Sequence, residues 1–556
     1  MKVSRRDLLL GTAGLTVGIF FTPVPWKVLD DVSVWTQNWP WIPQPARGPV
    51  TTKLASCTLC ASGCGLRVRM AAGYPVGISG NASHPLTSGA LCPLGFAAHQ
   101  LNWHPARLRE VRHRGRTASW EEARAAFEKA CAEGPIAVVD GRSGRAASRV
   151  LQSFAVRHSG AYEVVLTAEE KALLPYAQWA GVPVSDLGYD LENTRTIVSF
   201  GAPLLDGWGV PGRFTHLWSE RAAGAADPQL RLIQIEPALS RTAAAAWHWV
   251  PLCQGTEGLL AATLAKVLVE EHLIPAQGPL PPASLTEAAT QTGLTPTAIR
   301  DLAYSMVERR PTLAIGPDDN PAIAALNVLL GSLGTPGGIV RKSSASSATS
   351  QISTKNVTPR AVLIDSTVPW EYIPASGIEV FRFAAWDGGG NRADWLLPSP
   401  GFLEETTDLP TPPTSAHAVY GIAPSLLTPS TELKTAAEFL QQIDATLPTI
   451  EQSIHMRCDA IFRRRRGSVH GAKPSPITGF ESAAKFEDAL RAGAVWLDES
   501  PSVTPLKCVL KAWPTGNPAH TSGNWANAWA PPVLPTLAGK LYRESSLREA
   551  PQRSQS

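Results

Sequence analysis

Short strand-like runs alternate with helical stretches along the middle of the chain. Four runs are rich in β-branched and other apolar residues, and most of them end in glycine or an acidic residue. They are 135–141 (PIAVVDG), 195–201 (RTIVSFG), 230–237 (LRLIQIEP) and 311–316 (PTLAIG). Helical patterns lie between several of them, notably at 256–273 and 321–333. This alternation predicts an α/β protein with doubly wound, mostly parallel sheets, whose ligands bind where loops leave the carboxyl ends of the strands.

Two further helices are predicted on either side of this region. Ser119 and Glu122 have the spacing of a capping box at the start of SWEEARAAFEKACAEG. A second helix is predicted from about Glu432, and it leads toward four consecutive arginines at 463–466. Such a run is typical of a solvated face, and contact with an acidic lipid or an acidic partner is the alternative.

Other segments lack a regular pattern. Residues 28–50 carry four prolines and several tryptophans, so we expect an extended segment that serves as a docking surface or as core filler. Residues 339–377 are rich in serine and threonine, which predicts a surface loop or linker. From about residue 491, short strands mixed with turns predict a small β-rich module.

Length and charge narrow the functional class. The chain has 556 residues, which is enough for three or four domains. Its 44% hydrophobic and 17% charged residues are typical of a globular protein, and a net charge of +3 argues against nucleic acid as the main partner.

The N-terminus has the pattern of an export signal. The segment from Ser4 to Leu8 (SRRDL) precedes an apolar run that ends at Phe21, as in twin-arginine signals, which export folded proteins. A basic start of a buried helix is the alternative. The run is short for a transmembrane helix and no A-x-A cleavage site follows it, so it is interpreted as a signal or a retained anchor. We therefore expect the protein on the periplasmic side of the cytoplasmic membrane.

Four cysteines form the strongest chemical signal in the chain. Cys57, Cys60 and Cys64 fall within eight residues, and Cys92 follows after 27 intervening residues. Structural zinc sites use two close pairs of ligands, whereas three cysteines on one loop with a distant fourth suit a cubane, in which each iron takes one thiolate. Glycines on both sides of Cys64 let backbone N–H groups turn toward sulfur. The spacing favours a [4Fe-4S] cluster over zinc or unrelated thiols.

The other four cysteines are far apart in sequence. They are Cys131, Cys253, Cys458 and Cys508. Disulfides are possible in an oxidising compartment, but no framework spacing relates these residues. They are interpreted as buried single residues rather than bridges.

Taken together, these motifs resemble the molybdopterin oxidoreductase superfamily, the group of the dimethyl sulfoxide reductases, from about residue 50 onward. The landmarks are the cysteine loop with GALCPLG, the SWEEA segment, IQIEPALSRTAAAAWHWVPLCQGTEG, NVLLGSLGTPGGIV and ADWLLPSPGFLEE. The resemblance implies that Glu236 and the turn Gly255, Thr256 and Glu257 contact a molybdopterin guanine dinucleotide. A carboxylate can accept two hydrogen bonds from a guanine edge, and N–H groups that open a helix can face phosphate. A simple helix cap is the alternative for the turn.

Three departures from the family pattern point away from molybdenum. The family commonly has Cys-x-Lys-Gly at the fourth cluster ligand, with the lysine between cluster and pterin, whereas this chain has Leu94 there. The metal-ligating residue of catalytic members corresponds to a window at about 140–185, which here contains no cysteine and leaves Ser153 and Ser159 as alternatives. The chain is also short for the family, with a curtailed C-terminal domain.

A narrower resemblance accounts for these departures. VWTQNWPWIPQP, DLENTRTIVSFGAPLLDGWGVPGRF and PVLPTLAGKLYRESSLRE are similar to segments of the molybdopterin-like iron–sulfur subunits of menaquinone reductase complexes and, more distantly, of alternative complex III. In those assemblies the subunit keeps the fold without molybdenum. It lies beside a multihaem cytochrome c, a ferredoxin-like iron–sulfur subunit and a quinone-binding membrane subunit. The resemblance transfers the cluster ligands and no catalytic residue.

The resemblance also sets the expected domain order. It is 1–27, twin-arginine signal or anchor; 28–50, Trp/Pro-rich extended segment; 51–112, [4Fe-4S] domain; 113–460, molybdopterin-oxidoreductase-like α/β domains; 461–490, basic linker; and 491–556, truncated dinucleotide-binding-like β domain.

Three functions are consistent with these observations. The first is a periplasm-facing iron–sulfur electron-transfer subunit of a membrane-associated quinone reductase complex, without molybdenum. The second is a catalytic molybdenum-bis(pterin guanine dinucleotide) oxidoreductase that acts on a small oxyanion. The third is a non-redox scaffold whose cluster is only a structural staple.

Overall fold

The computed structural model describes most of the chain in two compact units. The described residues are 4–21, 28, 48–205, 207–275, 279–342, 358–365, 377–387, 393–428, 430, 432–500, 506, 510 and 512–514. One unit comprises Met1–Thr51 with Met70–Tyr74, and the other comprises Thr52–Arg69 with Pro75–Ser556. Most of the Trp/Pro-rich segment lies outside the described residues, and so does Cys508.

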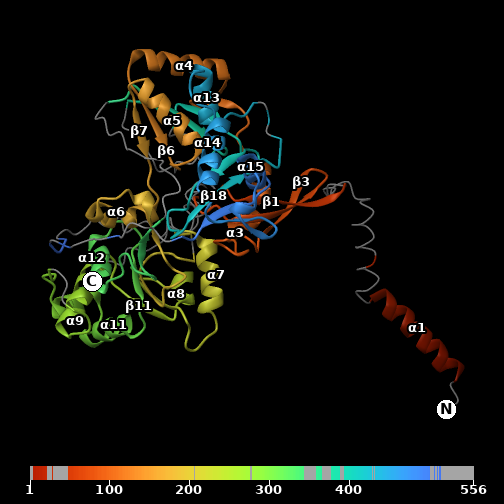
Figure 1. Ribbon diagram of the computed structural model, residues 1–556. Helices are drawn as coiled ribbons and strands as arrows, with labels where there is room; N and C mark the ends of the chain where they lie inside the picture. The colour runs from red at the N-terminus through yellow and green to blue at the C-terminus, as the bar shows by residue number, and fades with distance from the viewer. Residues whose placement is uncertain are drawn as a thin grey trace, which may run out of the picture. The chain divides into compact units, whose positions relative to one another are not determined.

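Helix α1 (Arg5–Phe21) belongs to the first unit (Figure 1). It contains the twin arginines and the apolar run, and Ser4 begins it by accepting a hydrogen bond from the Asp7 N–H at 3.2 Å. The described side chains of α1 are exposed. No helix among the described residues is both long enough and apolar enough to cross a membrane.

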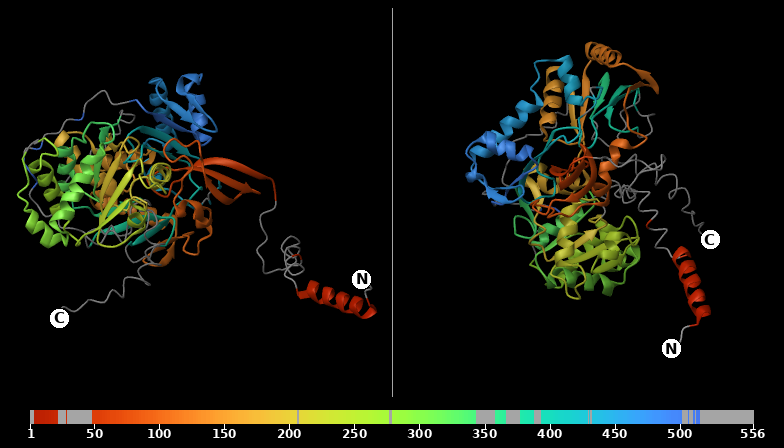
Figure 2. Two further views of the ribbon diagram at one scale, coloured as in Figure 1. Left: turned by 90° about the horizontal axis from the view of Figure 1, so that it is seen from below. Right: turned by 90° about the vertical axis from the view of Figure 1, so that its right-hand side faces the viewer.

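A seven-stranded sheet forms the first α/β part of the second unit. Its order is β5-β4-β16-β15-β14-β6-β7. The strands are β4 (Val111–His113), β5 (Arg116–Ala118), β6 (Ile136–Asp140), β7 (Ala161–Val164), β14 (Ala361–Ile364), β15 (Glu379–Ala384) and β16 (Trp395–Pro398). The strands from β16 to β7 are parallel, whereas β4 and β5 pair antiparallel. Figure 2 shows strands from distant parts of the sequence, orange and green to teal, side by side in this sheet.

Helices α4 (Trp120–Glu133), α5 (Ala146–Arg157) and α13 (Ala436–Ile443) pack on one face of this sheet. Phe127 of α4 lies at the centre of their core, with its ring centroid 5.0 Å from that of Phe381 and 5.6 Å from that of Phe439. The predicted capping box of Ser119 and Glu122 is present at the start of α4.

A second, four-stranded sheet has the order β11-β10-β9-β12 and is parallel throughout. Its strands are β9 (Thr196–Phe200), β10 (Arg231–Glu236), β11 (His248–Pro251) and β12 (Thr312–Ile315). Helices α9 (Glu257–Glu270), α10 (Leu285–Thr292), α11 (Pro296–Glu308) and α12 (Pro321–Leu330) build the core on one face. Helices α6 (Ala168–Ala180) and α7 (Pro211–Arg221) build the core on the other, and the short α8 (Arg241–Ala245) follows β10. The predicted doubly wound parallel α/β architecture is confirmed.

The smaller sheets lie mainly in the second unit, although the ends of β1, β2 and β3 belong to the first. Strands β1 (Val50–Ser56), β2 (Gly65–Ala71) and β3 (Tyr74–Gly80) form a three-stranded sheet, and β8 (Leu187–Tyr189) pairs with β13 (Ile339–Arg341). An antiparallel sheet has the order β17-β18-β21-β19-β20, with β17 (Thr407–Leu409), β18 (Ala418–Ala423), β19 (Ser468–His470), β20 (Pro474–Pro476) and β21 (Val495–Asp498). Helices α14 (Ile450–Arg463) and α15 (Ala483–Arg491) contribute to its core. The remaining short elements are α3 (Pro93–Ala97), η1 (Ala98–Trp103), η2 (Val184–Asp186) and η3 (Ile477–Gly479).

Three local predictions differ from the structure. Within the segment predicted to be a loop or linker at 339–377, residues 361–364 form the buried central strand β14. The helix predicted from about Glu432 begins at Ala436, because Thr435 and Glu438 form its capping box. Helix α12 ends at Leu330, because Gly331 adopts a left-handed conformation at φ +74°.

The four consecutive arginines at 463–466 are exposed, as expected for a solvated face. Arg463 pairs with Asp459 at 2.6 Å and Arg466 with Asp498 at 3.3 Å. Part of this positive charge is therefore already paired within the chain.

Candidate metal centre

The loop between β1 and β2 carries three of the four predicted metal ligands. Cys57 directly follows β1, and Cys64 directly precedes β2. The Cys57 N–H donates to the Cys64 carbonyl at 2.8 Å, so the loop closes on itself with Cys60 between them. Gly63 turns the chain back toward β2 with φ +60°, a conformation that glycine adopts at little steric cost.

The fourth cysteine comes from a separate segment. Cys92 is the N-cap residue of α3, and its Sγ accepts a hydrogen bond from the Gly95 N–H at 3.4 Å. Burial raises the pKa of the Cys57 and Cys64 thiols, and the charges of neighbouring thiols, including Cys92, raise it further. Burial also raises the pKa of Cys60, and Cys92 adds to the effect. These mutual effects place the four predicted ligands in one electrostatic neighbourhood.

The donor set suits a cubane better than a single metal ion. A tetrahedral zinc ion needs four sulfurs about 2.3 Å from one point, whereas each sulfur around a cubane binds a different iron. In the part of the chain that the structure describes, no three His, Cys, Asp or Glu side chains converge tightly enough to hold one ion. Three thiols on one loop and a fourth at the start of a neighbouring helix are a donor set that fits a [4Fe-4S] cluster.

A backbone N–H group lies beside each of the four thiols. The Gly95 N–H donates to Cys92, and the N–H groups of Leu59, Ser62 and Gly212 lower the pKa of Cys57, Cys60 and Cys64, respectively, against the larger effect of burial. The Ser62 hydroxyl adds a contact of 3.1 Å to Cys60 Sγ. Hydrogen bonds of this kind stabilise thiolates and are among the factors that set the potential of an iron–sulfur cluster.

Helix α7 brings its N-terminus to Cys64. Pro211 is at the first helical position, and Gly212 follows with its N–H directed at the sulfur. A Cβ at Gly212 would lie 3.2 Å from Cys64 Sγ and 2.8 Å from the Ala90 carbonyl oxygen. Glycine therefore permits the close approach, and the positive end of the helix dipole faces the thiolate.

Arg142 reaches the cysteine loop from the seven-stranded sheet. It lies in the turn after β6, where the carboxyl ends of parallel strands place ligand-binding loops. Its Nη1 donates to the carbonyl oxygen of Thr58 at 2.9 Å, inside the loop that holds Cys57 and Cys60. Its positive charge favours the thiolate forms of both cysteines, although burial is the larger effect and raises their pKa.

A buried ion cluster lies beside Arg142 and occupies the carboxyl ends of β6 and β14. We call Asp140, Arg145 and Asp365 the edge ion cluster. Arg145 donates to Asp140 at 3.4 Å and makes a closer ion pair with Asp365. Tyr162 donates to the other oxygen of Asp140 at 2.8 Å. Burial raises the pKa of the nearby Glu405 carboxyl to about 7, Asp365 contributes to the rise, and Arg145 opposes it.

The residues predicted to contact a dinucleotide lie at the carboxyl edge of the four-stranded sheet. Glu236 ends β10 and accepts hydrogen bonds from Gln234 Nε2 at 2.9 Å and from the Ser240 N–H at 3.3 Å. The Gly255 N–H donates to Glu257 at 3.3 Å. The Thr256 N–H donates to the Cys253 carbonyl at 3.3 Å, and the Thr256 hydroxyl donates to the same oxygen at 2.6 Å. The N–H groups of this turn are thus used within the chain.

Two buried polar atoms at the same sheet nevertheless lack a partner among the described residues. They are Gln234 Oε1 in β10 and Asn320 Nδ2 at the start of α12. The amide of Asn320 lies close to Gly258 in the first turn of α9, where a Cβ would be 3.3 Å from Nδ2. One acceptor and one donor are therefore free for a ligand.

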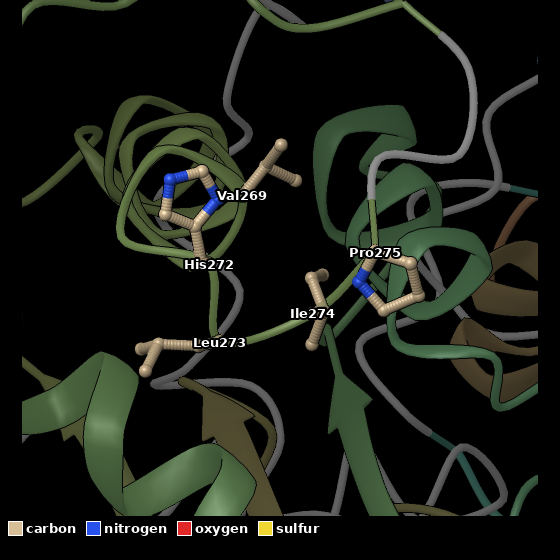
Figure 3. Close-up of a pocket in the computed structure, with 5 residues that line it drawn as sticks. All are labelled: Val269, His272, Leu273, Ile274 and Pro275. Atoms are coloured by element: carbon tan, nitrogen blue, oxygen red, sulfur yellow. The ribbon is translucent and has the colours of Figure 1, made fainter.

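The cysteines outside the loop are free thiols where the structure describes them. Cys458 is buried and Cys131 is partly buried, as expected for single residues. Cys253 is exposed, which corrects its predicted burial, because it precedes the turn into α9. A pocket of about 350 Å³ at the end of α9 is lined by Val269, His272, Leu273, Ile274 and Pro275 (Figure 3). None of the predicted site residues lines it.

Sequence reasoning missed three residues beside the cysteines. Arg142 and Gly212 come from segments far along the chain, and no spacing rule connects them with the loop. His84 packs against Gly65, where a Cβ would lie 2.6 Å from the His84 Cβ, and burial lowers the His84 pKa to about 3. The position of Arg142 directly after a predicted strand was the one available signal.

Comparison with known proteins adds evolutionary evidence. Residues 50–102 match the family described as the molybdopterin oxidoreductase Fe4S4 domain. The menaquinone reductase molybdopterin-binding-like subunit of Nitratidesulfovibrio vulgaris is 29% identical over 497 residues, covering 79% of this chain and 71% of that protein. The nitrate reductase of Klebsiella oxytoca is 26% identical over 322 residues, covering 52% of this chain and 36% of that protein.

A solved structure supports the fold assignment. Acetylene hydratase from Pelobacter acetylenicus is similar with a TM-score of 0.57 at 12% identity, covering 81% of this chain and 74% of that one. This likeness concerns the fold alone. The matched domain, the relatives and the shared fold agree with the cysteine loop and the parallel sheets. Residues 50–102 match the molybdopterin oxidoreductase Fe4S4 domain, and the rest of the chain is similar to proteins that are named as molybdopterin-binding-like subunits or molybdopterin enzymes.

Proposed function

We propose that this protein is the iron–sulfur electron-transfer subunit of a membrane-associated quinone reductase complex that faces the periplasm and lacks molybdenum. The observation that carries the proposal is the gathering of four thiols, each with a backbone N–H group beside it, at Cys57, Cys60, Cys64 and Cys92. The similarity to a menaquinone reductase subunit supports the assembly, and the twin-arginine pattern supports the compartment.

The proposed chemistry needs no acid or base from this chain. A cubane held by the four cysteines would accept one electron and pass one electron on, with no bond made or broken in the protein. Its potential would follow from the hydrogen bonds to sulfur, the burial and the local charge. The electron donor would be a multihaem cytochrome c, and the acceptors a ferredoxin-like subunit and a quinone-binding membrane subunit.

Two observations support the absence of molybdenum from this proposal. The edge ion cluster fills the carboxyl ends of β6 and β14 with side chains of the protein itself. Of the two alternative ligands, Ser159 lies after α5, and the adjacent Gly160 packs on the carbonyl of Ile136 at the start of β6. Ser159 is therefore at the opposite end of β6 from Arg142.

Metal analysis of anaerobically purified protein tests the proposal. We expect about four iron atoms and four sulfides per chain, no stoichiometric molybdenum, and an EPR signal on reduction. The Cys64→Ala variant should lose the iron and the signal. The matched control Cys458→Ala removes a buried thiol elsewhere and should keep both. About one molybdenum atom per chain, or iron-free wild-type protein, would contradict the proposal.

A molybdenum oxidoreductase that acts on a small oxyanion is the second candidate. The unpartnered Gln234 Oε1, in the strand that Glu236 ends, and the unpartnered Asn320 Nδ2 at the start of α12 favour it, because a guanine dinucleotide offers matching donors and acceptors. Acid denaturation of the purified protein would then release a guanine nucleotide and a fluorescent pterin. A non-redox scaffold is distinguished by Cys60→Ser, which would leave quinone reduction by the complex unchanged.

A further inference from the structure

We propose that Arg142 is a positioning residue that supplies the positive charge beside the cluster and thereby raises its reduction potential. The charge that relatives place after the fourth cysteine is absent here, where Leu94 occupies that position. The structure brings a guanidinium to the cysteine loop from the turn after β6 and anchors it on the carbonyl oxygen of Thr58 at 2.9 Å. This inference rests on the proposed [4Fe-4S] cluster.

The turn that carries Arg142 is held rigidly. The Arg142 N–H donates to Asp140 at 2.9 Å. The Arg142 carbonyl oxygen accepts hydrogen bonds from Arg145 Nε at 3.0 Å and from the Ser148 hydroxyl at 3.1 Å. Further along, Arg457 donates to the Gly144 carbonyl at 2.6 Å. A side chain on so fixed a turn holds its charge at a defined place relative to the cysteine loop.

Arg142 forms no ion pair with a carboxylate among the described residues. Within the described residues, the carboxylates of Asp140 and Asp365 are paired with Arg145, and no carboxylate forms an ion pair with Arg142. The guanidinium is only partly exposed, so water screens it less than a surface charge. The charge of Arg142 acts on Cys60 and Cys57 of the loop, and Arg145, Asp365 and Glu405 also act on Arg142.

A cation at this place favours the reduced cluster. Four thiolates give the centre a net negative charge, and each added electron makes that charge more negative. Local positive charge offsets the increase, and the net charge of the site is one of the determinants of cluster potential. The single hydrogen bond to Thr58 also fixes the loop that holds Cys57 and Cys60, so the charge and the ligand positions are set by the same side chain.

The test is an EPR-monitored redox titration of three variants of the full chain. Arg142→Gln removes the charge and keeps a hydrogen-bond donor, whereas Arg142→Lys keeps the charge. Arg149→Gln is the matched control, because it removes the same charge from an exposed position on α5. We expect Arg142→Gln to make the midpoint potential more negative by about 59 mV, which corresponds to a tenfold change in the equilibrium constant for one-electron reduction. Arg142→Lys should stay near the wild-type value, and Arg149→Gln should not shift.

The outcomes separate this inference from the proposed function. Wild-type protein with iron and an EPR signal supports the cluster, and the midpoint of Arg142→Gln then decides the role of the arginine. An unshifted midpoint with full iron content would overturn the inference and leave the electron-transfer function standing. If Arg142→Gln does not assemble the cluster, the decision rests on Arg142→Lys. Normal iron content and a wild-type midpoint potential in that variant support the role of the charge. Loss of iron in both variants would overturn it.

Discussion

Backbone N–H groups lie beside the sulfur of each of the four cysteines, and they come from three separate segments of the chain. Leu59 and Ser62 belong to the cysteine loop itself, Gly95 to the first turn of α3, and Gly212 to the first turn of α7. The cysteines could be identified from their spacing, because three of the ligands lie on one loop and are close together in the sequence. Gly212 could not be identified in this way, since its role depends on how α7 packs.

Gly212→Ala tests the requirement for close approach at this residue. The added methyl group would lie 2.8 Å from the Ala90 carbonyl oxygen and 3.2 Å from Cys64 Sγ, so either the loop or α7 must shift. We expect a loss of at least half of the bound iron, measured against protein concentration. Gly479→Ala is the control, because a Cβ there meets nothing within 4 Å. Full iron content in Gly212→Ala would show that the contact is dispensable.

At the scale of secondary structure, strands β9, β10 and β12 lie within the runs that were predicted to be strands. These runs could be recognised because they are apolar, rich in β-branched residues and flanked by turns. Strand β14 was missed because only Ala361–Ile364 are buried between polar stretches, and four apolar residues do not distinguish a strand from a loop. Its place in the middle of the seven-stranded sheet is decided by pairing with β6 and β15.

The raised pKa of Glu405, near the carboxyl ends of β6 and β14, predicts that the stability of the fold depends on pH. Burial and the nearby Asp365 and Glu438 carboxylates raise the pKa of Glu405 to about 7, while Arg145 and Arg142 oppose the rise. A carboxyl whose pKa is higher in the folded state stabilises the fold fully below its unfolded pKa, and this stabilisation is lost as the pH rises through about 7.

Glu405→Gln removes this titration. Relative to the wild type, the variant should gain stability between about pH 4.5 and pH 8, on the order of 2 kcal/mol, because one pKa unit corresponds to about 1.4 kcal/mol and the group is partly exposed. Thermal unfolding at several pH values measures the gain, with the exposed Glu128→Gln as control. A constant difference between wild type and variant across this range would contradict the assignment.

The whole molecule combines two parallel α/β sheets with a cysteine loop supplied by a small β-sheet. The class of fold could be predicted, because several strands and the helices between them have recognisable local patterns in the sequence, although β14 does not. The contact of Arg142 with the loop could not, because it joins residues 84 positions apart and depends on the packing of the seven-stranded sheet against the loop. Family resemblance supplied the cluster domain, and the structure supplied its surroundings.

Removal of iron should affect this molecule locally. A chelator applied under reducing conditions would leave four free thiols, two of which, Cys57 and Cys64, are buried with a raised pKa, and the covalent links between the loop and α3 would be gone. Hydrogen exchange should then rise around 57–65 and 91–95, while the strands of the four-stranded sheet keep their protection. Equal loss of protection throughout the chain would indicate that the cluster supports the entire fold.

The contact between Gly212 and Cys64 bears on how the protein acquires its iron. The ribosome makes the cysteine loop early and α7 much later, so the contact of Gly212 with Cys64 forms only after both parts have been synthesised and packed. We therefore expect iron and sulfide to be inserted after α7 has been synthesised. A short N-terminal fragment would contain the cysteines without the contact of Gly212 with Cys64.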